Sequence, residues 1–130
     1  MRILLIAFAV LFLSSCKKEA IVLQDQLYGK WDWEKSTGGI AGVTNLPAPG
    51  ELRTLEFFTS GKYEMRKNDS LESEGIFHIE KMASQFSTDQ EYAVVYQKGP
   101  MPQIIRIKGN DLVLLDNAAD GFANFYIRIK

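Results

Sequence analysis

The sequence has few of the residues on which metal binding and disulfide bonding depend. Its 130 residues include one cysteine, Cys16, and one histidine, His78. A single cysteine excludes an internal disulfide and a multi-cysteine zinc site, and a single histidine excludes a histidine-rich metal cluster. We therefore expect no metal site and no cofactor.

The chain also has no excess of charge of either sign. The chain has 15 Lys and Arg against 16 Asp and Glu, a net charge of −1. No basic surface points to nucleic acid, and no glycine-rich phosphate-binding motif is present. The hydrophobic share of 46% and the charged share of 24% are ordinary for one globular domain, which argues against disorder.

The amino terminus carries the one long apolar run. Ile3 to Leu13 follows Arg2 and precedes Ser14, Ser15 and Cys16. A positive start, an apolar centre and small residues before a cleavage point are the parts of a secretory signal. The run is shorter than the roughly 20 residues of a transmembrane helix. A buried core helix is the alternative, and the lack of any polar face counts against it.

The residues Leu13-Ser14-Ser15-Cys16 resemble the lipobox of bacterial lipoproteins. The resemblance implies a diacylglyceryl group on the sulfur of Cys16, removal of residues 1–15 and acylation of the new amino terminus. More than one acyl chain anchors a protein stably to a membrane. We therefore expect a lipid-anchored protein of the bacterial cell envelope, in the outer rather than the inner membrane. The alternative is a secreted protein with an unpaired thiol, which is unusual in an oxidising compartment.

Residues 16–26 are expected to be a lipidated tether and residues 27–130 a folded domain. In the domain, apolar and polar residues alternate with a period of two, which is typical of strands. Eight strands are expected: Gly29 to Glu34, Leu52 to Phe58, Tyr63 to Arg66, Glu72 to Glu80, Tyr92 to Gln97, Gln103 to Lys108, Leu112 to Asp116 and Asn124 to Lys130.

Short turns between these strands predict an antiparallel meander without a long helix. Closure of the sheet removes its exposed edges. The predicted fold is all-β, an eight-stranded antiparallel up-and-down barrel after a cleaved N-terminal signal helix. A two-layer sandwich is the alternative, and pairing between the first and last strands distinguishes the two.

Several short motifs resemble the lipocalin-like domain of small envelope lipoproteins. Gly29-Lys30-Trp31 is similar to the G-x-W sequence that opens lipocalins, and the resemblance continues through Leu55 to Tyr63, Glu74 to Phe77 and Leu112 to Arg128. It spans residues 27–130 and supports the barrel.

The resemblance also implies that an arginine of the last strand packs over Trp31 in a cation–π contact, with Arg128 as the candidate. Strict alternation places Arg128 opposite Phe125, Ile127 and Ile129. If those three side chains face inward, Arg128 can reach Trp31 only around the end of the barrel.

Aromatic side chains inside the barrel are the candidate ligand contacts. They can hold an apolar ligand with tyrosine hydroxyls as polar tips, or simply fill the core. The irregular segment from Ser36 to Gly50 is either a lid over the barrel mouth or a flexible connector. The candidate ligand-binding residues are Trp31, Trp33, Phe57, Tyr63, Phe77, Tyr92 and Tyr96.

No set of residues indicates catalysis. His78 is expected to face solvent, and no nucleophile with a partner base can be identified. The carboxylate pairs Asp32/Glu34 and Glu72/Glu74 each share one strand face, as on a solvated surface. The segment from residue 116 to 121 lacks the oxygen-ligand spacing of a calcium loop and is expected to be a turn.

The sequence therefore predicts a membrane-anchored, non-catalytic binding module for a small apolar ligand. The alternative is a structural or interaction protein whose filled barrel docks another protein of the envelope. In both cases the membrane is the expected partner through the lipid on Cys16.

Overall fold

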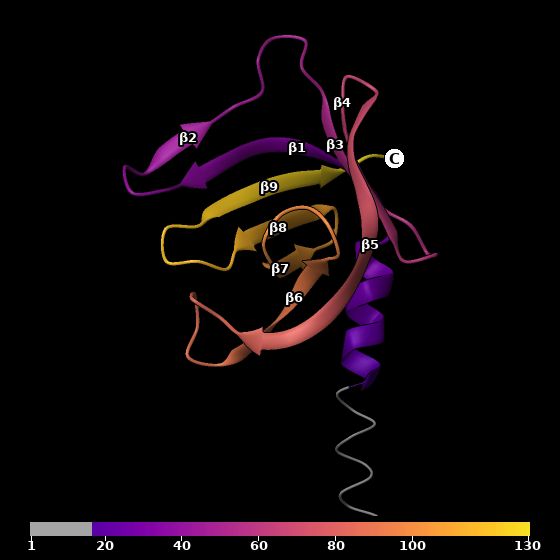
Figure 1. Ribbon diagram of the computed structural model, residues 1–130, viewed down its shortest axis with the longest axis vertical. Helices are drawn as coiled ribbons and strands as arrows, with labels where there is room; N and C mark the ends of the chain where they lie inside the picture. The colour runs from indigo at the N-terminus through magenta and orange to yellow at the C-terminus, as the bar shows by residue number, and fades with distance from the viewer. Residues whose placement is uncertain (1–16) are drawn as a thin grey trace, which may run out of the picture.

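The computed structural model describes residues 17–130 as one helix followed by strands (Figure 1). The expected signal segment and the lipidation of Cys16 lie outside the described residues. In the described part of the chain, no helix is long and apolar enough to cross a membrane.

Within residues 17–130, nine strands form one antiparallel sheet. They are β1 (Gly29–Gly38), β2 (Val43–Asn45), β3 (Arg53–Phe57), β4 (Lys62–Lys67), β5 (Ser70–Ala83), β6 (Gln90–Tyr96), β7 (Gln103–Lys108), β8 (Asp111–Asp116) and β9 (Phe122–Arg128). The eight predicted strands correspond to β1 and to β3 through β9.

The sheet closes on itself. β1 pairs with β3 on one side and with β9 on the other, where Trp31 lies opposite Arg128 and Gly38 opposite Phe122. Pairing of the first and last strands confirms the eight-stranded barrel and excludes the sandwich. The seam between β6 and β7 is the shortest, with two register pairs against six between β7 and β8.

The segment from Ser36 to Gly50 is more regular than predicted. β1 continues to Gly38, and the short strand β2 folds back onto it, with Ser36 opposite Asn45. Gly39 and Gly42 have positive φ angles of 74° and 61° in the connecting turn, a conformation that glycine adopts without steric cost. The expectation of a wholly irregular loop is therefore wrong: residues 36–38 and 43–45 lie in strands, and the turn at 39–42 and residues 46–50 lie outside them.

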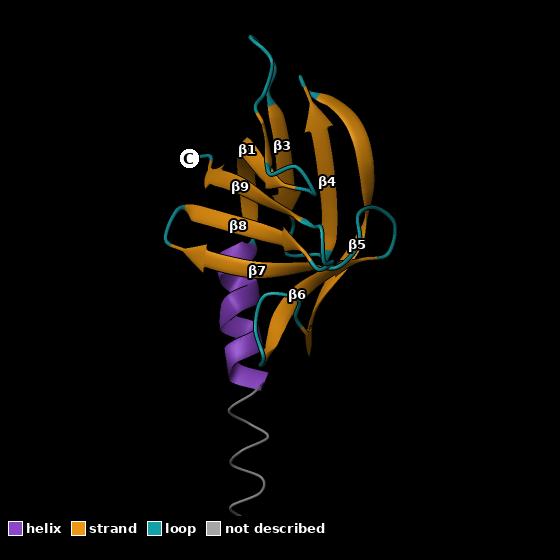
Figure 2. Cartoon of the chain, turned by 90° about the vertical axis from the view of Figure 1, so that its left-hand side faces the viewer, coloured by secondary structure: helices purple, strands orange, loops and turns teal. Residues whose placement is uncertain are grey.

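Residues 17–27 form a helix where the sequence indicated a tether (Figure 2). Leu27 is fully buried and Leu23 packs against the core, whereas Ile21 and Val22 are exposed. The spacing of four residues places both leucines on one helix face. The carbonyl of Leu27 accepts a hydrogen bond from Nε1 of Trp31 at 2.9 Å, so the helix end is fixed to the barrel.

Large side chains fill the barrel beside this helix. The rings of Phe57 and Phe77 meet edge to face at 4.8 Å, as do those of Tyr63 and Tyr96. This geometry adds to the stabilisation from burial. The core cluster consists of Leu27, Trp31, Leu55, Phe57, Tyr63, Phe77, Val94, Tyr96, Ile105, Leu112 and Leu114.

Arg128 lies over Trp31, with its guanidinium carbon 4.2 Å from the ring centroid, as the resemblance implied. It also donates hydrogen bonds to the carbonyls of Gln26, in the last turn of the helix, and of Tyr28, directly after it. Ile127 is 40% exposed on the outer face, so Arg128 takes the inward position on β9. The structure does not show the other arrangement. In that arrangement Arg128 would have reached Trp31 around the end of the barrel, because the side chains of Phe125, Ile127 and Ile129 would have faced inward.

Candidate binding site at the barrel mouth

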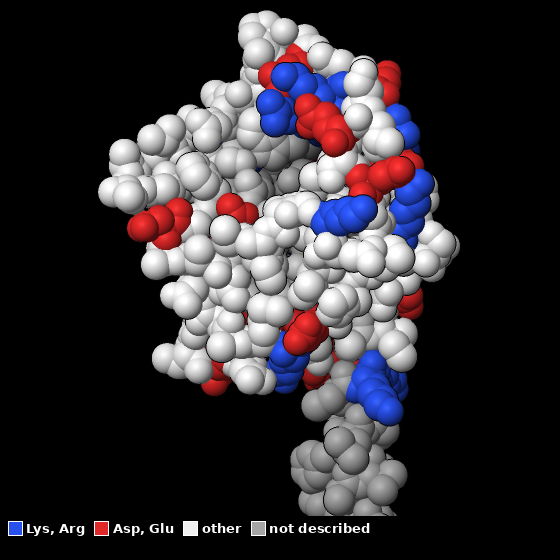
Figure 3. Space-filling model, in the orientation of Figure 1, with Lys and Arg blue, Asp and Glu red and all other residues white. Residues whose placement is uncertain are grey.

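The two ends of the barrel differ. Beyond the filled core, at the end remote from the helix, lies a hollow of about 190 Å³, which we call the mouth. Figure 3 shows a depression in the molecular surface beside a group of acidic and basic side chains. The mouth is lined by Trp33, Ser36, Arg53, Thr54, Leu55, Met65, Arg66, Glu72, Asn124 and Tyr126.

A β-bulge explains how β1 contributes two side chains to the mouth. The register with β9 shifts between Trp33 and Lys35, so Glu34 is the extra residue. A bulge changes which side chains face inward along a strand. Trp33 and Ser36, three positions apart, both line the mouth for this reason, although strict alternation would place them on opposite faces.

Hydrogen bonds hold the polar side chains of the mouth in place. Nε1 of Trp33 donates to Oγ of Ser36 at 2.9 Å, and Ser36 donates to Oδ1 of Asn124 at 2.7 Å. Nδ2 of Asn124 donates to the Asp116 carboxylate at 3.0 Å. Such a connected network fixes each member in one orientation.

The same network continues into the filled core. Nε2 of Gln103 donates to Oδ1 of Asp116 at 2.8 Å, and the hydroxyl of Tyr96 donates to Oε1 of Gln103 at 2.8 Å. Burial raises the pKa of Tyr96 well above its usual value, so its hydroxyl remains a donor. The mouth therefore has a floor whose polar groups are already paired.

Arg53 covers one side of the mouth. Its guanidinium carbon lies 5.3 Å from the centroid of the Trp33 ring, and its Nε donates to the carboxylate of Glu51. This hydrogen bond lowers the pKa of Glu51, so the carboxylate stays charged. The two terminal nitrogens of Arg53 have no hydrogen-bond partner among residues 17–130.

A second hollow of about 390 Å³ lies beside the mouth, beneath the segment that follows β2. Trp33, Ser36, Arg53 and Asn124 line both hollows, and Asn45, Leu46 and Phe122 are among those that line only the second. The stacked pair of Arg53 and Trp33 therefore stands between the two spaces.

Tyr126 supplies a second unpaired polar group. Its side chain lines the mouth, and its hydroxyl has no hydrogen-bond partner in the described part of the chain. Burial, followed by the nearby charge of Asp116, raises the pKa of Tyr126 well above its usual value. The hydroxyl is therefore protonated at neutral pH and able to donate.

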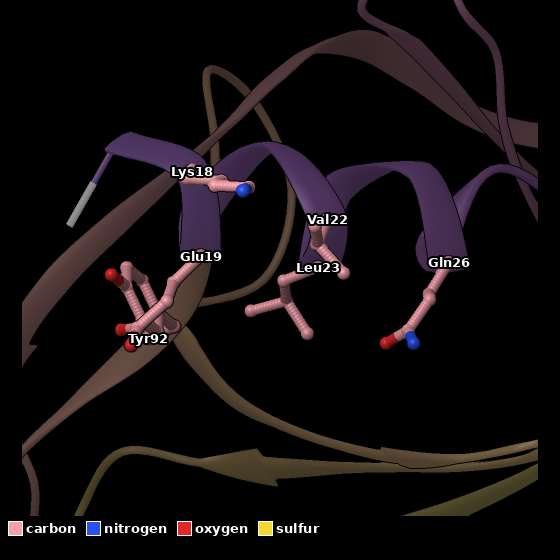
Figure 4. A pocket seen from close by; sticks show the side chains of 6 residues that line it. All are labelled: Lys18, Glu19, Val22, Leu23, Gln26 and Tyr92. Carbon is pink, nitrogen blue, oxygen red and sulfur yellow. The ribbon is translucent and has the colours of Figure 1, made fainter. Parts of the chain in front are cut away.

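The structure separates the seven aromatic residues that the sequence indicated as ligand contacts. Trp33 alone among them lines the mouth. Tyr92 lies apart, in a wide hollow between the helix and β6 that Val22, Leu23 and Gln26 also line (Figure 4). The other five, Trp31, Phe57, Tyr63, Phe77 and Tyr96, belong to the filled core.

Sequence reasoning missed Arg53, Asn124 and Tyr126. Arg53 begins a strand after a glycine- and proline-containing segment and belongs to no recognisable motif. Tyr126 was assigned only to a motif, because alternation along β9 left its direction open. A bulge in β1 leaves no signal in the sequence, so the combination of these residues with Trp33 could not be foreseen.

His78 and Glu74 lie on the outer surface, whereas Glu72, which was expected to share a strand face with Glu74, lines the mouth beside a register shift between β4 and β5. His78 is exposed and pairs with Glu80 at 3.1 Å, as expected of a solvent-facing histidine. Glu74 forms an ion pair with Lys62 at 3.1 Å. Among the described residues, no three acidic, cysteine or histidine side chains are grouped as metal ligands.

Comparison with known proteins gives no further guide to the site. No protein-family model, no curated protein and no solved structure gives a significant match to this chain. The barrel and the chemistry of its mouth are therefore the features that bear on what the protein does.

Proposed function

We propose that this protein is a lipid-anchored, non-catalytic binding module of the bacterial envelope that holds a small molecule at the barrel mouth. One observation carries the proposal. The core beside the helix is filled, yet the opposite end keeps a hollow with apolar walls and pre-positioned polar groups. Ligand sites combine these two features.

The size of the mouth limits its ligand. About 190 Å³ is smaller than the roughly 300–1,000 Å³ of pockets for drug-sized molecules. Trp33, Leu55 and Met65 offer apolar surface, and Arg53 and Tyr126 offer polar contacts. A small, partly apolar molecule fits this lining better than a long lipid, because the filled core leaves no deeper space.

Tryptophan fluorescence tests ligand binding. Titration of the full-length protein with small amphipathic molecules should shift the tryptophan emission, because Trp33 lines the mouth. In the Trp33→Phe variant only the buried Trp31 remains, and the shift should largely disappear. Absence of any shift across such a panel, together with unchanged NMR spectra, would contradict ligand binding at the mouth.

The anchor is supported by the Leu13-Ser14-Ser15-Cys16 motif directly before the helix. Mass spectrometry of protein purified from bacterial membranes should show an acylated amino terminus at Cys16, and labelled palmitate should be incorporated. Cys16→Ser should abolish both. An intact amino terminus at Met1 in the purified wild-type protein would overturn the anchor.

Exposed apolar side chains favour an interaction protein as the second candidate. Ile40 is 91% exposed and Leu46 68% exposed in the segment between β1 and β3, with Leu52 close to the start of β3. Apolar groups on a surface often mark contact sites. Cross-linking in intact cells should trap a stoichiometric partner if this candidate holds, and Ile40→Ser with Leu46→Ser should prevent it.

A further inference from the structure

We propose that the mouth selects small carboxylates and that Arg53 is the residue that binds the carboxylate group. This inference rests on the proposed binding function and specifies the chemical class of the ligand.

The guanidinium of Arg53 is held in place with its outer edge unused. The Trp33 ring supports one face, and Glu51 accepts from Nε. Nη1 and Nη2 have no partner among the described residues. These two nitrogens form a planar pair of donors that matches the two oxygens of a carboxylate.

Arg66, the other arginine of the mouth, is fully engaged. Its Nε and Nη2 donate to the Glu64 carboxylate at 3.3 and 3.2 Å, and its Nη1 donates to the Asp69 carbonyl at 3.0 Å. Arg53 is therefore the arginine of the mouth with donors to spare for a ligand.

Tyr126 adds a third donor. Its hydroxyl lines the same hollow and has no partner within residues 17–130. By contrast, the hydroxyl of Ser36 already donates to Asn124, and the amide of Asn124 already donates to Asp116. Arg53 and Tyr126 therefore both have donors to spare, so a ligand that bonds to these two side chains has to bring acceptor oxygens.

Three acidic residues near the mouth oppose an anion. Glu51 accepts from Nε of Arg53 and so offsets part of the charge of the guanidinium. Asp116 already accepts from Gln103, Asn124 and the backbone N–H of Phe122, which offsets its charge locally. Glu72 is exposed, and water and salt screen its charge. All three carboxylates weaken the binding of an anion, but none of them occupies Nη1 or Nη2 of Arg53. Removal of the Glu72 charge should therefore strengthen carboxylate binding.

The apolar wall sets the length of the ligand. The hollow of about 190 Å³ corresponds to about six water volumes of roughly 30 Å³ each. A six-carbon chain is of that order and can lie against Trp33, Leu55 and Met65. Hexanoate is therefore a suitable probe, with hexanamide and 1-hexanol as neutral molecules of the same length.

The test compares these three probes on the full-length protein by Trp33 fluorescence and NMR. Hexanoate should bind about tenfold or more tightly than either neutral probe, because hydrogen bonds to a charged group contribute most. Arg53→Gln should remove this preference. Arg106→Gln is the matched control, because Arg106 is similarly exposed but pairs with Glu91 on β6 and should leave the preference intact.

Two further variants separate the contributions at the mouth. Tyr126→Phe should weaken hexanoate binding about three- to tenfold, since it removes one donor. Glu72→Gln should strengthen the binding of hexanoate more than the binding of 1-hexanol, because only hexanoate is charged. Arg53→Lys keeps the positive charge but not the paired donors, so it should bind hexanoate with intermediate affinity. Circular dichroism of every variant identifies any that fails to fold.

The outcomes distinguish this inference from the function on which it rests. Equal affinities for the three probes, or an unchanged preference in Arg53→Gln, would overturn carboxylate selection and leave ligand binding in place. If no probe binds and Trp33 does not respond to any of them, both carboxylate selection and small-molecule binding at the mouth are contradicted.

Discussion

At the scale of single residues, Gly29 shows why the start of β1 needs a glycine. Its φ is +121°, and a Cβ built there would lie 2.8 Å from Nη1 of Arg128. That guanidinium stacks on Trp31 and bonds the carbonyl of Tyr28. The glycine of the Gly29-Lys30-Trp31 motif therefore makes room for the contact between the first and last strands.

Gly29→Ala should lower the free energy of unfolding by about 1 to 3 kcal/mol from backbone strain alone, with a further loss as Arg128 shifts. Gly42→Ala is the control. Its φ of +61° is also positive, but nothing lies within 4 Å of the added Cβ, so a loss of about 1 kcal/mol is expected. Urea denaturation measures both, and equal losses would refute the role assigned to Gly29.

Residue chemistry was only partly readable in the sequence. Arg128 was identified through the resemblance to lipocalins, and His78 through its polar setting on a strand. Arg53 and Tyr126 were not identified, because no motif marks them. What distinguishes them is that each has a hydrogen-bond donor at the mouth without a partner among the described residues. Whether a side-chain donor has a partner depends on which residues the fold places beside it, and the sequence does not show this.

At the scale of elements, the alternation of apolar and polar residues was sufficient to predict each strand of the barrel. The helix was missed, because residues 17–27 combine charged and apolar residues over only a few turns, and its stability comes from packing rather than propensity. The bulges in β1 and between β4 and β5 were missed as well, since an extra residue in a strand looks like any other.

Docking of the helix should depend on one face. Leu27→Ala should destabilise the protein by about 2 to 5 kcal/mol, because Leu27 is fully buried in the core. Ile21→Ala, at a position that is 59% exposed, should change stability by less than about 0.5 kcal/mol. Thermal unfolding of the two variants compares them, and a small effect of Leu27→Ala would show that the helix does not contribute to the core.

At the scale of the whole molecule, the barrel is closed but not uniformly paired. β6 and β7 share two register pairs, whereas β4 and β8 are paired along most of their length on both sides. Local opening is expected where few backbone hydrogen bonds hold two strands together.

Hydrogen exchange should therefore be faster for amides on the facing edges of β6 and β7 than for amides of β4 and β8. Native-state exchange followed by NMR measures this residue by residue. Uniform protection around the barrel would show that packing of the helix and core compensates for the short seam.

Because Trp31 pairs with Arg128, the barrel cannot close during synthesis until β9 has been made. β1 is synthesised early, but β9, which pairs with one of its edges, is the last strand of the barrel to be made. Until residues 122–128 emerge, β1 and β8 each retain a bare edge, and Trp31 lacks the guanidinium that covers it. Chains truncated before β9 are accordingly expected to be substrates for proteases and prone to edge-to-edge association, because the barrel can close only once β9 has been made.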